Sequence, residues 1–297
     1  MMLVQATTQG SDDAVENFDA AYKVYQHNKR TFNVICLVVL GVCFGFSIFS
    51  TEFDFSVLID GLPRTREFLF RLIPPITYDE FSLDILDWYW NIEEWMENLL
   101  NTLLMAFLAT LLGTIIGGAL SFFAARNLVK NYATYWITRR ILEVARTVPD
   151  IVWALIFVIT FGVGPMAGVL AILLHTIGAQ GKLFAEVNEN ISHHPIEGVR
   201  ASGGNWVQEI RFAVLPQVMP NFMSYTFWRF ELNVRSATIV GFVGAGGIGH
   251  DLFIAIQLLE FPDAGAILLI VVTTIMLIDM ASEKLRHYLV GKESLKR

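Results

Sequence analysis

Apolar residues along this chain gather into six long runs that polar segments separate. The runs cover residues 31–50, 99–125, 148–163, 165–179, 218–243 and 264–281. About twenty helical residues cross the hydrocarbon layer of a membrane, because each residue of an α-helix rises about 1.5 Å. The pattern therefore predicts an all-α membrane protein with six transmembrane helices. A short turn at "GVGP" would join the third and fourth runs as a helical hairpin.

The composition agrees with a chain that lies in lipid. The 297 residues are 54% hydrophobic and 16% charged, and the mean hydropathy is +0.52, whereas roughly a quarter of the residues of a soluble domain are charged. No small-residue cleavage site follows the first apolar run, so we expect that run to remain as an anchor rather than to be removed as a signal peptide. Membrane lipid is therefore an expected partner, and nucleic acid is not.

Basic residues are spread unevenly among the polar segments. If the amino terminus is cytoplasmic, the inner segments hold 16 of the 21 lysine and arginine residues, and the outer segments hold only Arg64, Arg66 and Arg71. Lysine and arginine favour cytoplasmic loops, so we predict that both termini are cytoplasmic. The inner segments in this prediction are 1–30, 126–147, 182–217 and 282–297.

The chain is expected to divide unevenly. Residues 1–90 would form a cytoplasmic tail, the first transmembrane helix and an acidic external segment, and residues 91–290 would form a compact core of five spans. Residues 291–297 would form a cytoplasmic C-terminal tail.

Residues with obvious catalytic or metal-binding chemistry are few. Cys36 and Cys43 both lie in the first apolar run, so neither a disulfide nor a metal site is indicated. The histidines at 175, 193 and 194 lack the spacing of metal ligands. Because no nucleophile elbow, zinc helix motif or phosphate-binding loop is present, we expect no catalytic residue, no metal and no cofactor in this chain.

A polar segment between the fourth and fifth runs, residues 193–215, predicts two short helices on the inner side of the membrane. Pro195 suits the first turn of a helix, and Glu197 lies where the helix dipole favours a carboxylate. Gly203 and Gly204 would end this first helix.

The second helix of the segment begins with a capping-box pattern. Asn205 is the expected cap, and Gln208 follows three residues later. The apolar stripe of this helix is predicted to consist of Val207, Ile210 and Val214. From the residues alone, such a helical hairpin either docks a partner or only packs its own spans together.

The spacing of this segment resembles the EAA loop of the permease subunits of bacterial ABC importers. The usual form of that loop is E-A-A, three residues, G, nine residues, I, one residue and L-P. Glu197, Gly203, Leu215 and Pro216 stand at the matching positions. The departures are Gly198 and Val199 in place of the paired alanines, and Ala213 in place of isoleucine.

The resemblance extends over residues 91–290 and is strongest to the phosphonate-import subfamily. It includes "RRILEVARTVPDIVWA", "GKLFAEVNENI" and "RFELNVRSATIVGFVGAGGIG". It implies a type I permease fold in the inner membrane of a bacterium, with the loop 193–215 as the coupling helix. The residues expected to contact an ATPase subunit are Glu197, Gly198, Arg200, Ala201, Gly203, Leu215 and Pro216.

The resemblance also implies partners. Two ATP-binding subunits would bind ATP and Mg, a solute-binding protein would deliver the solute from outside, and a second copy of the chain would complete the pathway as a homodimer. The chain itself would be a non-catalytic subunit.

The fifth run contains ionisable residues. Such a side chain at mid-membrane costs at least about 2.5 to 3.5 kcal/mol, so it has to find a partner or a polar path. Glu231 and Arg235 have the spacing of a helical ion pair, whereas Arg229 has no acid nearby on its helix, although Asn233 is within reach. These charges either line a path on which a guanidinium meets an oxyanion, or form an internal network that never touches solute.

The sequence "GAGGIG", residues 244–249, matches a dinucleotide-binding fingerprint in its letters only. It follows a membrane span rather than a strand, so we reject that interpretation. Its glycines would instead allow close packing or a break in the helix at the outer end of the translocation path, a plain flexible turn being the alternative. The glycines concerned are Gly244, Gly246, Gly247 and Gly249.

The function that the sequence favours is the permease subunit of an ATP-driven importer for a small oxyanion, such as a phosphonate, phosphite or phosphate ester. The same fold could instead serve methionine, betaine or a sulfonate. From a different class, an intramembrane hydrolase of lipid phosphates would use the buried charges, although the chain lacks a paired nucleophile and base. A passive channel would show flux without ATP.

Overall fold

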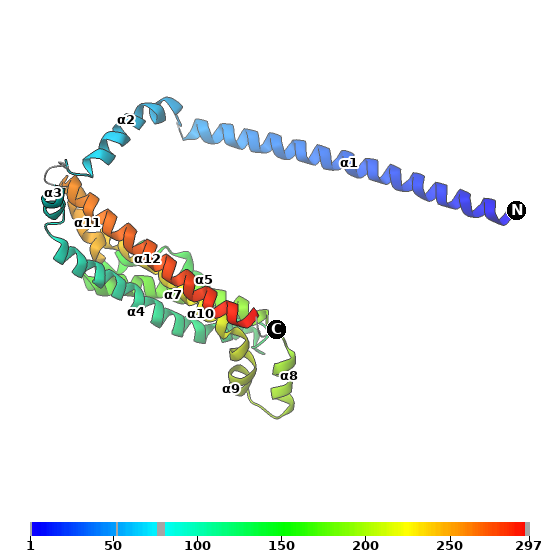
Figure 1. Ribbon diagram of the computed structural model, residues 1–297. Helices are drawn as coiled ribbons and strands as arrows, with labels where there is room; N and C mark the ends of the chain where they lie inside the picture. The colour runs from blue at the N-terminus through cyan, green and yellow to red at the C-terminus, as the bar shows by residue number, and fades with distance from the viewer. Residues whose placement is uncertain (1, 52, 76–80, 295–297) are drawn as a thin grey trace. The chain divides into compact units, whose positions relative to one another are not determined.

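The computed structural model describes the backbone of residues 2–51, 53–75 and 81–294, and the side chains of residues 22–51, 53–75 and 82–286. Within these residues every regular element is a helix (Figure 1). The elements are α1 (Met2–Ser50), α2 (Phe55–Arg71), α3 (Phe81–Trp88), α4 (Ile92–Ala124), α5 (Tyr132–Thr147), α6 (Asp150–Phe161), α7 (Pro165–Glu189), α8 (His194–Ala201), α9 (Trp206–Gln208), the π-helical η1 (Glu209–Val214), α10 (Leu215–Val240), the π-helical η2 (Gly241–Ala245), α11 (Ile248–Gln257) and α12 (Phe261–Ser294).

Four helices are long and apolar enough to cross a membrane unaided. They are the Tyr22–Ser50 part of α1, the whole of α4 and α7, and the Phe261–Arg286 part of α12. Two bent pairs pass the same test when both helices of a pair are taken together: α5 with α6, bent by 86°, and the helix Trp206–Ala245 with α11, bent by 57°. By length and composition, the described residues contain four spans, or six when each bent pair counts as one span, and six is the number that the apolar runs predict.

The third apolar run, residues 148–163, corresponds to α6, which has 12 residues. That is about 18 Å of helix, which is short for a span. Residues 132–147, predicted to be part of an inner polar segment, form α5, which is long enough to cross together with α6 only if the pair, bent by 86°, is one span. Pro149 explains the break, because a proline donates no backbone hydrogen bond and keeps Val148 in an extended conformation.

The fourth span is ten residues longer than its apolar run, since α7 continues to Glu189. Its last turns carry polar side chains that interrupt the run, yet these side chains have partners in the bundle. Lys182 Nζ lies 3.4 Å from Glu143 Oε1, and Asn188 donates a 3.0 Å hydrogen bond to Ser121. A helix continues past its apolar residues when neighbouring helices satisfy the polar ones.

Small residues set the closest helix contacts in the bundle. A Cβ on Gly178 of α7 would lie 2.5 Å from the Arg146 backbone nitrogen and 2.7 Å from the Leu142 carbonyl oxygen of α5. A Cβ on Gly117 of α4 would lie 2.9 Å from the Ile177 carbonyl oxygen of α7. Helices in lipid associate through such close packing, because lipid tails are as apolar as the side chains.

The end of α12 lies near the start of α10. Ion pairs join the two helices in antiparallel order, Arg235 to Asp279 at 2.7 Å and Glu231 to Arg286 at 3.8 Å. α8 and α9 project from this same end of the bundle (Figure 1). The hairpin between α7 and α10 and the last turns of α12 thus share one side of the protein.

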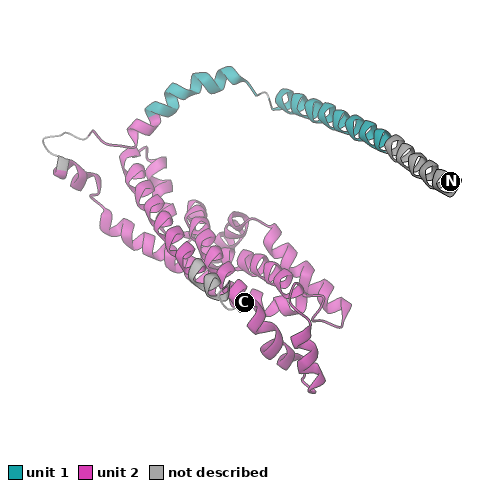
Figure 2. Ribbon diagram, turned by 45° about the vertical axis from the view of Figure 1, so that its right-hand side comes forward, with its two compact units in different colours: residues 1–67 teal, residues 68–297 magenta. Residues whose placement is uncertain are grey.

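The contacts divide the chain into two compact units, residues 1–67 and residues 68–297 (Figure 2). The first unit holds α1 and most of α2, and the large apolar side chains of residues 22–50 in α1 are exposed. The boundary predicted near residue 90 stays a prediction. Residues 291–294 of the predicted tail continue α12, and residues 295–297 lie outside the described residues.

Replacing Gly178 with Ala should destabilise the bundle by about 1–3 kcal/mol, because the added methyl group would overlap backbone atoms of α5 that cannot rotate away. Thermal unfolding in detergent measures the effect. Gly118→Ala is the matched control, since its methyl group would meet the Phe184 ring at an ordinary 3.7 Å. Equal unfolding temperatures for the two variants would contradict the packing described here.

Candidate functional site

The first helix of the loop 193–215, α8, ends just before Gly203 and Gly204, as predicted. α8 begins with Pro195 in its first turn, and it terminates in a Schellman motif. The Gly204 N–H donates to the Val199 carbonyl and the Gly203 N–H to the Arg200 carbonyl, each at 3.0 Å. Gly203 has a φ of +82°, which residues with a side chain rarely adopt.

The predicted capping box is present at the next helix. The Asn205 side chain accepts a 3.0 Å hydrogen bond from the Gln208 N–H, and the Gln208 side chain accepts a 2.7 Å hydrogen bond from the Asn205 N–H. Hydrogen bonds within the loop therefore end α8 and begin α9.

The second helix does not stop at Pro216 but continues into the membrane. A π turn, η1, precedes Pro216, with the Leu215 N–H donating to the carbonyl of Ile210. The stripe predicted from an α-helical period is wrong at Val207, which is 63% exposed although Val214 is buried. A π turn adds a residue to the turn, so residues seven apart no longer share one face.

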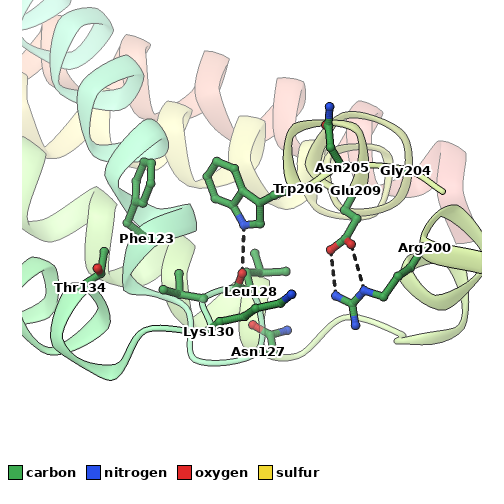
Figure 3. A pocket seen from close by; sticks show the side chains of 11 residues that line it. Phe123, Asn127, Leu128, Lys130, Thr134, Arg200, Gly204, Asn205, Trp206 and Glu209 are labelled. Carbon is green, nitrogen blue, oxygen red and sulfur yellow. Dashed lines mark hydrogen bonds and ion pairs between the residues drawn. The ribbon is translucent and has the colours of Figure 1, made fainter.

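An ion pair clamps the two arms of the hairpin together (Figure 3). Arg200 of α8 donates two hydrogen bonds of 2.9 Å to the two carboxylate oxygens of Glu209 in η1. The Glu209 side chain is largely buried, with 10% of its surface exposed. Its hydrogen bond and charge raise the pKa of the Arg200 guanidinium. Two parallel bonds fix the orientation as well as the distance of the arms.

Two further contacts hold the hairpin on the bundle. The Trp206 indole nitrogen donates a 2.9 Å hydrogen bond to the Leu128 carbonyl, and its ring lies 5.1 Å from that of Phe123, centre to centre. The Gln217 side chain binds both backbone groups of Ser192. Between the hairpin and the α4–α5 loop lies a cavity of about 660 Å³ (Figure 3).

The residues expected to contact an ATPase subunit fall into two groups. Glu197, Gly198, Ala201, Gly203 and Pro216 are exposed on the hairpin. Arg200 is engaged by Glu209, and Leu215 is half-buried at the foot of α10. The exposed hairpin also presents Val207 and Phe212.

The charges of α10 form two separate arrangements. Arg235 binds Glu231 at 2.8 Å, the predicted helical pair, and also Asp279 of α12. Arg229 is buried, and its Nε donates one long hydrogen bond of 3.5 Å to Thr176 of α7. Asn233 does not reach Arg229 as expected, because its side-chain nitrogen binds Thr110 and Thr176 instead.

The glycine sequence at residues 244–249 does break the helix. Gly244, Gly246 and Gly247 all have positive φ angles, and the chain turns into α11 directly after them. A Cβ on Gly249 would overlap the Thr238 carbonyl oxygen, so no side chain fits there. The Gly244 carbonyl accepts a 2.9 Å hydrogen bond from Gly164, which places the break beside the α6–α7 turn.

Known proteins that are similar to this chain are membrane components of transport systems. The family model for the binding-protein-dependent transport system inner membrane component matches residues 117–291. The chain belongs to this family. HtxC of Stutzerimonas stutzeri, named for phosphite transport, is 36% identical over 87% of this chain and 87% of its own length. PhnE of Mycolicibacterium smegmatis, named a phosphate-import permease protein, is 35% identical over 82% of this chain and 43% of its own length.

A solved bacterial ABC transporter for the import of alginate shares the fold of this permease. It has a TM-score of 0.59 at 12% identity and covers 84% of this chain and 98% of its own. The predicted type I ABC importer permease fold is confirmed, and so is the resemblance to phosphonate-type permeases. Because the relatives are transport permeases, the chain is a non-catalytic, multi-pass membrane subunit.

Replacing Glu209 with Gln should loosen the hairpin, because a neutral amide cannot hold both guanidinium nitrogens of Arg200. Amide hydrogen exchange in residues 203–208 should rise roughly two- to fivefold. Arg140→Ala is the control, since its ion pair with Glu143 lies on α5, away from the hairpin. Unchanged exchange in the Glu209 variant would show that the clamp contributes nothing to the order of the loop.

Proposed function

We propose that this permease forms the translocation path of an ATP-driven importer for a small oxyanion, a phosphonate, phosphite or phosphate ester, and that residues 193–215 are its coupling helix. The clamped hairpin carries the proposal. It is polar, rigid and exposed, and it stands between two membrane-spanning helices. Glu197 and Gly198 are exposed on α8. The Glu197 carboxylate lies 3.9 Å from His194, and nothing lies within 4 Å of a Cβ at Gly198, so this face of α8 is free to enter a cleft of a partner.

The hairpin is joined to α10 without a break in the helix. The chain is helical without a break from Trp206 through α9, η1 and α10 to the start of η2, where Val243 and Gly244 leave the helical conformation. A push on the hairpin would therefore tilt α10, including Arg229, Glu231 and Arg235, and would reach the glycine break at residues 244–247. Such rigid-body rocking is the simplest form of alternating access.

The partners follow from this mechanism. Two ATP-binding subunits, which hold ATP and Mg, would close on ATP binding and displace the hairpins. A solute-binding protein would deliver the anion on the opposite side, near the glycine break. Since the ATP-binding subunits act in the cytosol, the hairpin, the end of α12 and both termini would be cytoplasmic, as the basic residues predict.

A second permease subunit would complete the pathway. A two-fold homodimer is the simplest arrangement. The match to PhnE supports an assembly of two permease units, because 82% of this chain fills only 43% of PhnE and leaves room there for a second unit. A heterodimer with a related permease is the alternative, and native mass spectrometry of the purified assembly separates the two.

The names of HtxC and PhnE support an oxyanion as solute. A buried arginine in α10 agrees with a solute that carries an anionic group. Methionine, betaine and sulfonates, which carry such a group too, remain as alternatives of the same fold. Uptake by proteoliposomes that contain the whole assembly, with ATP inside and candidate loaded binding proteins outside, decides among them.

Replacing Gly203 with Val should reduce ATP-driven uptake at least tenfold while leaving the permease in the membrane. A β-branched residue at a φ of +82° is strained by about 1–3 kcal/mol and would unwind the Schellman turn. Gly203→Asn is the matched control, because asparagine tolerates this conformation and nothing lies within 4 Å of the position. Full uptake by the Val variant would count against the coupling role.

A further inference from the structure

The two arginines of α10 differ in their electrostatic surroundings. Arg235 lies between the carboxylates of Glu231 and Asp279, at 2.8 and 2.7 Å, and its charge is neutralised. Arg229 has no carboxylate within 4.0 Å in the part of the chain that the structure describes. Asp150 acts on its charge only at longer range. Arg235 is thus part of a structural ion-pair network, whereas no carboxylate pairs with Arg229.

Arg229 is largely buried, but its two terminal nitrogens are not closed off. The residue keeps 9% of its surface exposed, and Nε donates the 3.5 Å hydrogen bond to Thr176. Among the described residues, neither terminal nitrogen makes a hydrogen bond, and neither is a fully enclosed atom that lacks a partner. The two terminal nitrogens therefore retain accessible surface. A guanidinium offers these nitrogens as a fork that fits two oxygens of one oxyanion.

Thr176, which Arg229 binds, belongs to a group of polar side chains from three helices. Asn233 donates 2.8 and 2.9 Å hydrogen bonds to Thr110 of α4 and Thr176 of α7, and all three residues are buried. One turn along α7, Gln180 is also buried, and its Oε1 has no partner. The seam between α4, α7 and α10 is thus polar at the depth where lipid-facing surfaces have to be apolar.

We propose that Arg229, positioned by Thr176, which Asn233 binds in turn, is a binding site for a tetrahedral phosphorus oxyanion within the membrane. This inference rests on the proposed function and names the residue that meets its solute. A single cation without a carboxylate attracts the anion, yet one bidentate contact is weak enough to let it leave. Arg235 cannot serve in this way, because its two carboxylates would repel the anion.

The test uses the complete assembly of permease and ATP-binding subunits, with methylphosphonate as the probe and its neutral dimethyl ester as the control ligand. Methylphosphonate should raise the thermal unfolding temperature of the wild-type permease in a saturable way, and the ester should not, because a ligand stabilises the state that binds it. Arg229→Met should abolish this rise. Arg229→Lys, which keeps the charge but loses the fork, should retain part of it.

Stability without ligand separates a binding role from a structural one. Arg229→Met removes an uncompensated buried charge, so its unfolding temperature without ligand should equal or exceed that of the wild type. Arg235→Met leaves Asp279 without its ion pair and Glu231 with only the 3.8 Å contact to Arg286, so it should unfold at a lower temperature. In proteoliposomes, Arg229→Met should lower uptake from a loaded binding protein at least tenfold, with ATP hydrolysis still present.

Three results would overturn the site. They are an anion-dependent rise that persists in Arg229→Met, uptake by that variant at the wild-type rate, or a loss of stability or assembly in that variant without ligand. The last result would show that Arg229 pairs with a group of another subunit. Anion binding that depends on Arg229 in an assembly without ATP-driven uptake would instead refute the proposed function and leave the site standing.

Discussion

A bidentate ion pair between Arg200 and Glu209 makes α8 and the foot of α10 one body. Without it, the Gly203–Gly204 turn would be a hinge, and a force on the tip of the hairpin would bend the turn rather than move a helix. The Schellman bonds, the capping box and the anchoring of Trp206 on Leu128 add to the same stiffness. Because η1 continues into α10, the stiff hairpin extends as one helix to the glycine break at the opposite end of the bundle.

The helices of the bundle break at proline and glycine residues. In lipid, backbone polar groups have to be satisfied within the protein. Pro149 and the glycines at 244–247 break helices, and the freed groups find partners such as the Gly164–Gly244 bond and the Ile248 N–H to Thr102. The close approach of α4, α5 and α7 at glycine residues gives these breaks a rigid frame. Motion would then concentrate in α10 and the hairpin rather than in the frame.

Local signals predicted the hairpin well. Pro195, Gly203, Asn205 and Gln208 specify caps and turns through their own backbone geometry, so their positions follow from the chain alone. The predicted end of the fourth span was too early, because α7 continues through polar residues such as Lys182 that have partners on other helices. The hydropathy of a sequence shows that a residue is polar but not that a neighbouring helix pairs with it. The Arg200–Glu209 clamp was missed for the same reason, since nine residues and a turn separate its members. The π turn and the isolation of Arg229 from carboxylates likewise depend on neighbouring helices.

The central claim is that α8 of this hairpin meets an ATP-hydrolysing subunit in the cytosol. A single cysteine at Glu197, with Cys36 and Cys43 replaced by alanine, allows a short thiol crosslinker to report that contact in the assembled transporter. A cysteine at Arg64, an exposed position predicted to lie outside, is the matched control. The account predicts a covalent product with the ATP-binding subunit from position 197 and none from position 64. No product from position 197, or equal products from both, would contradict it.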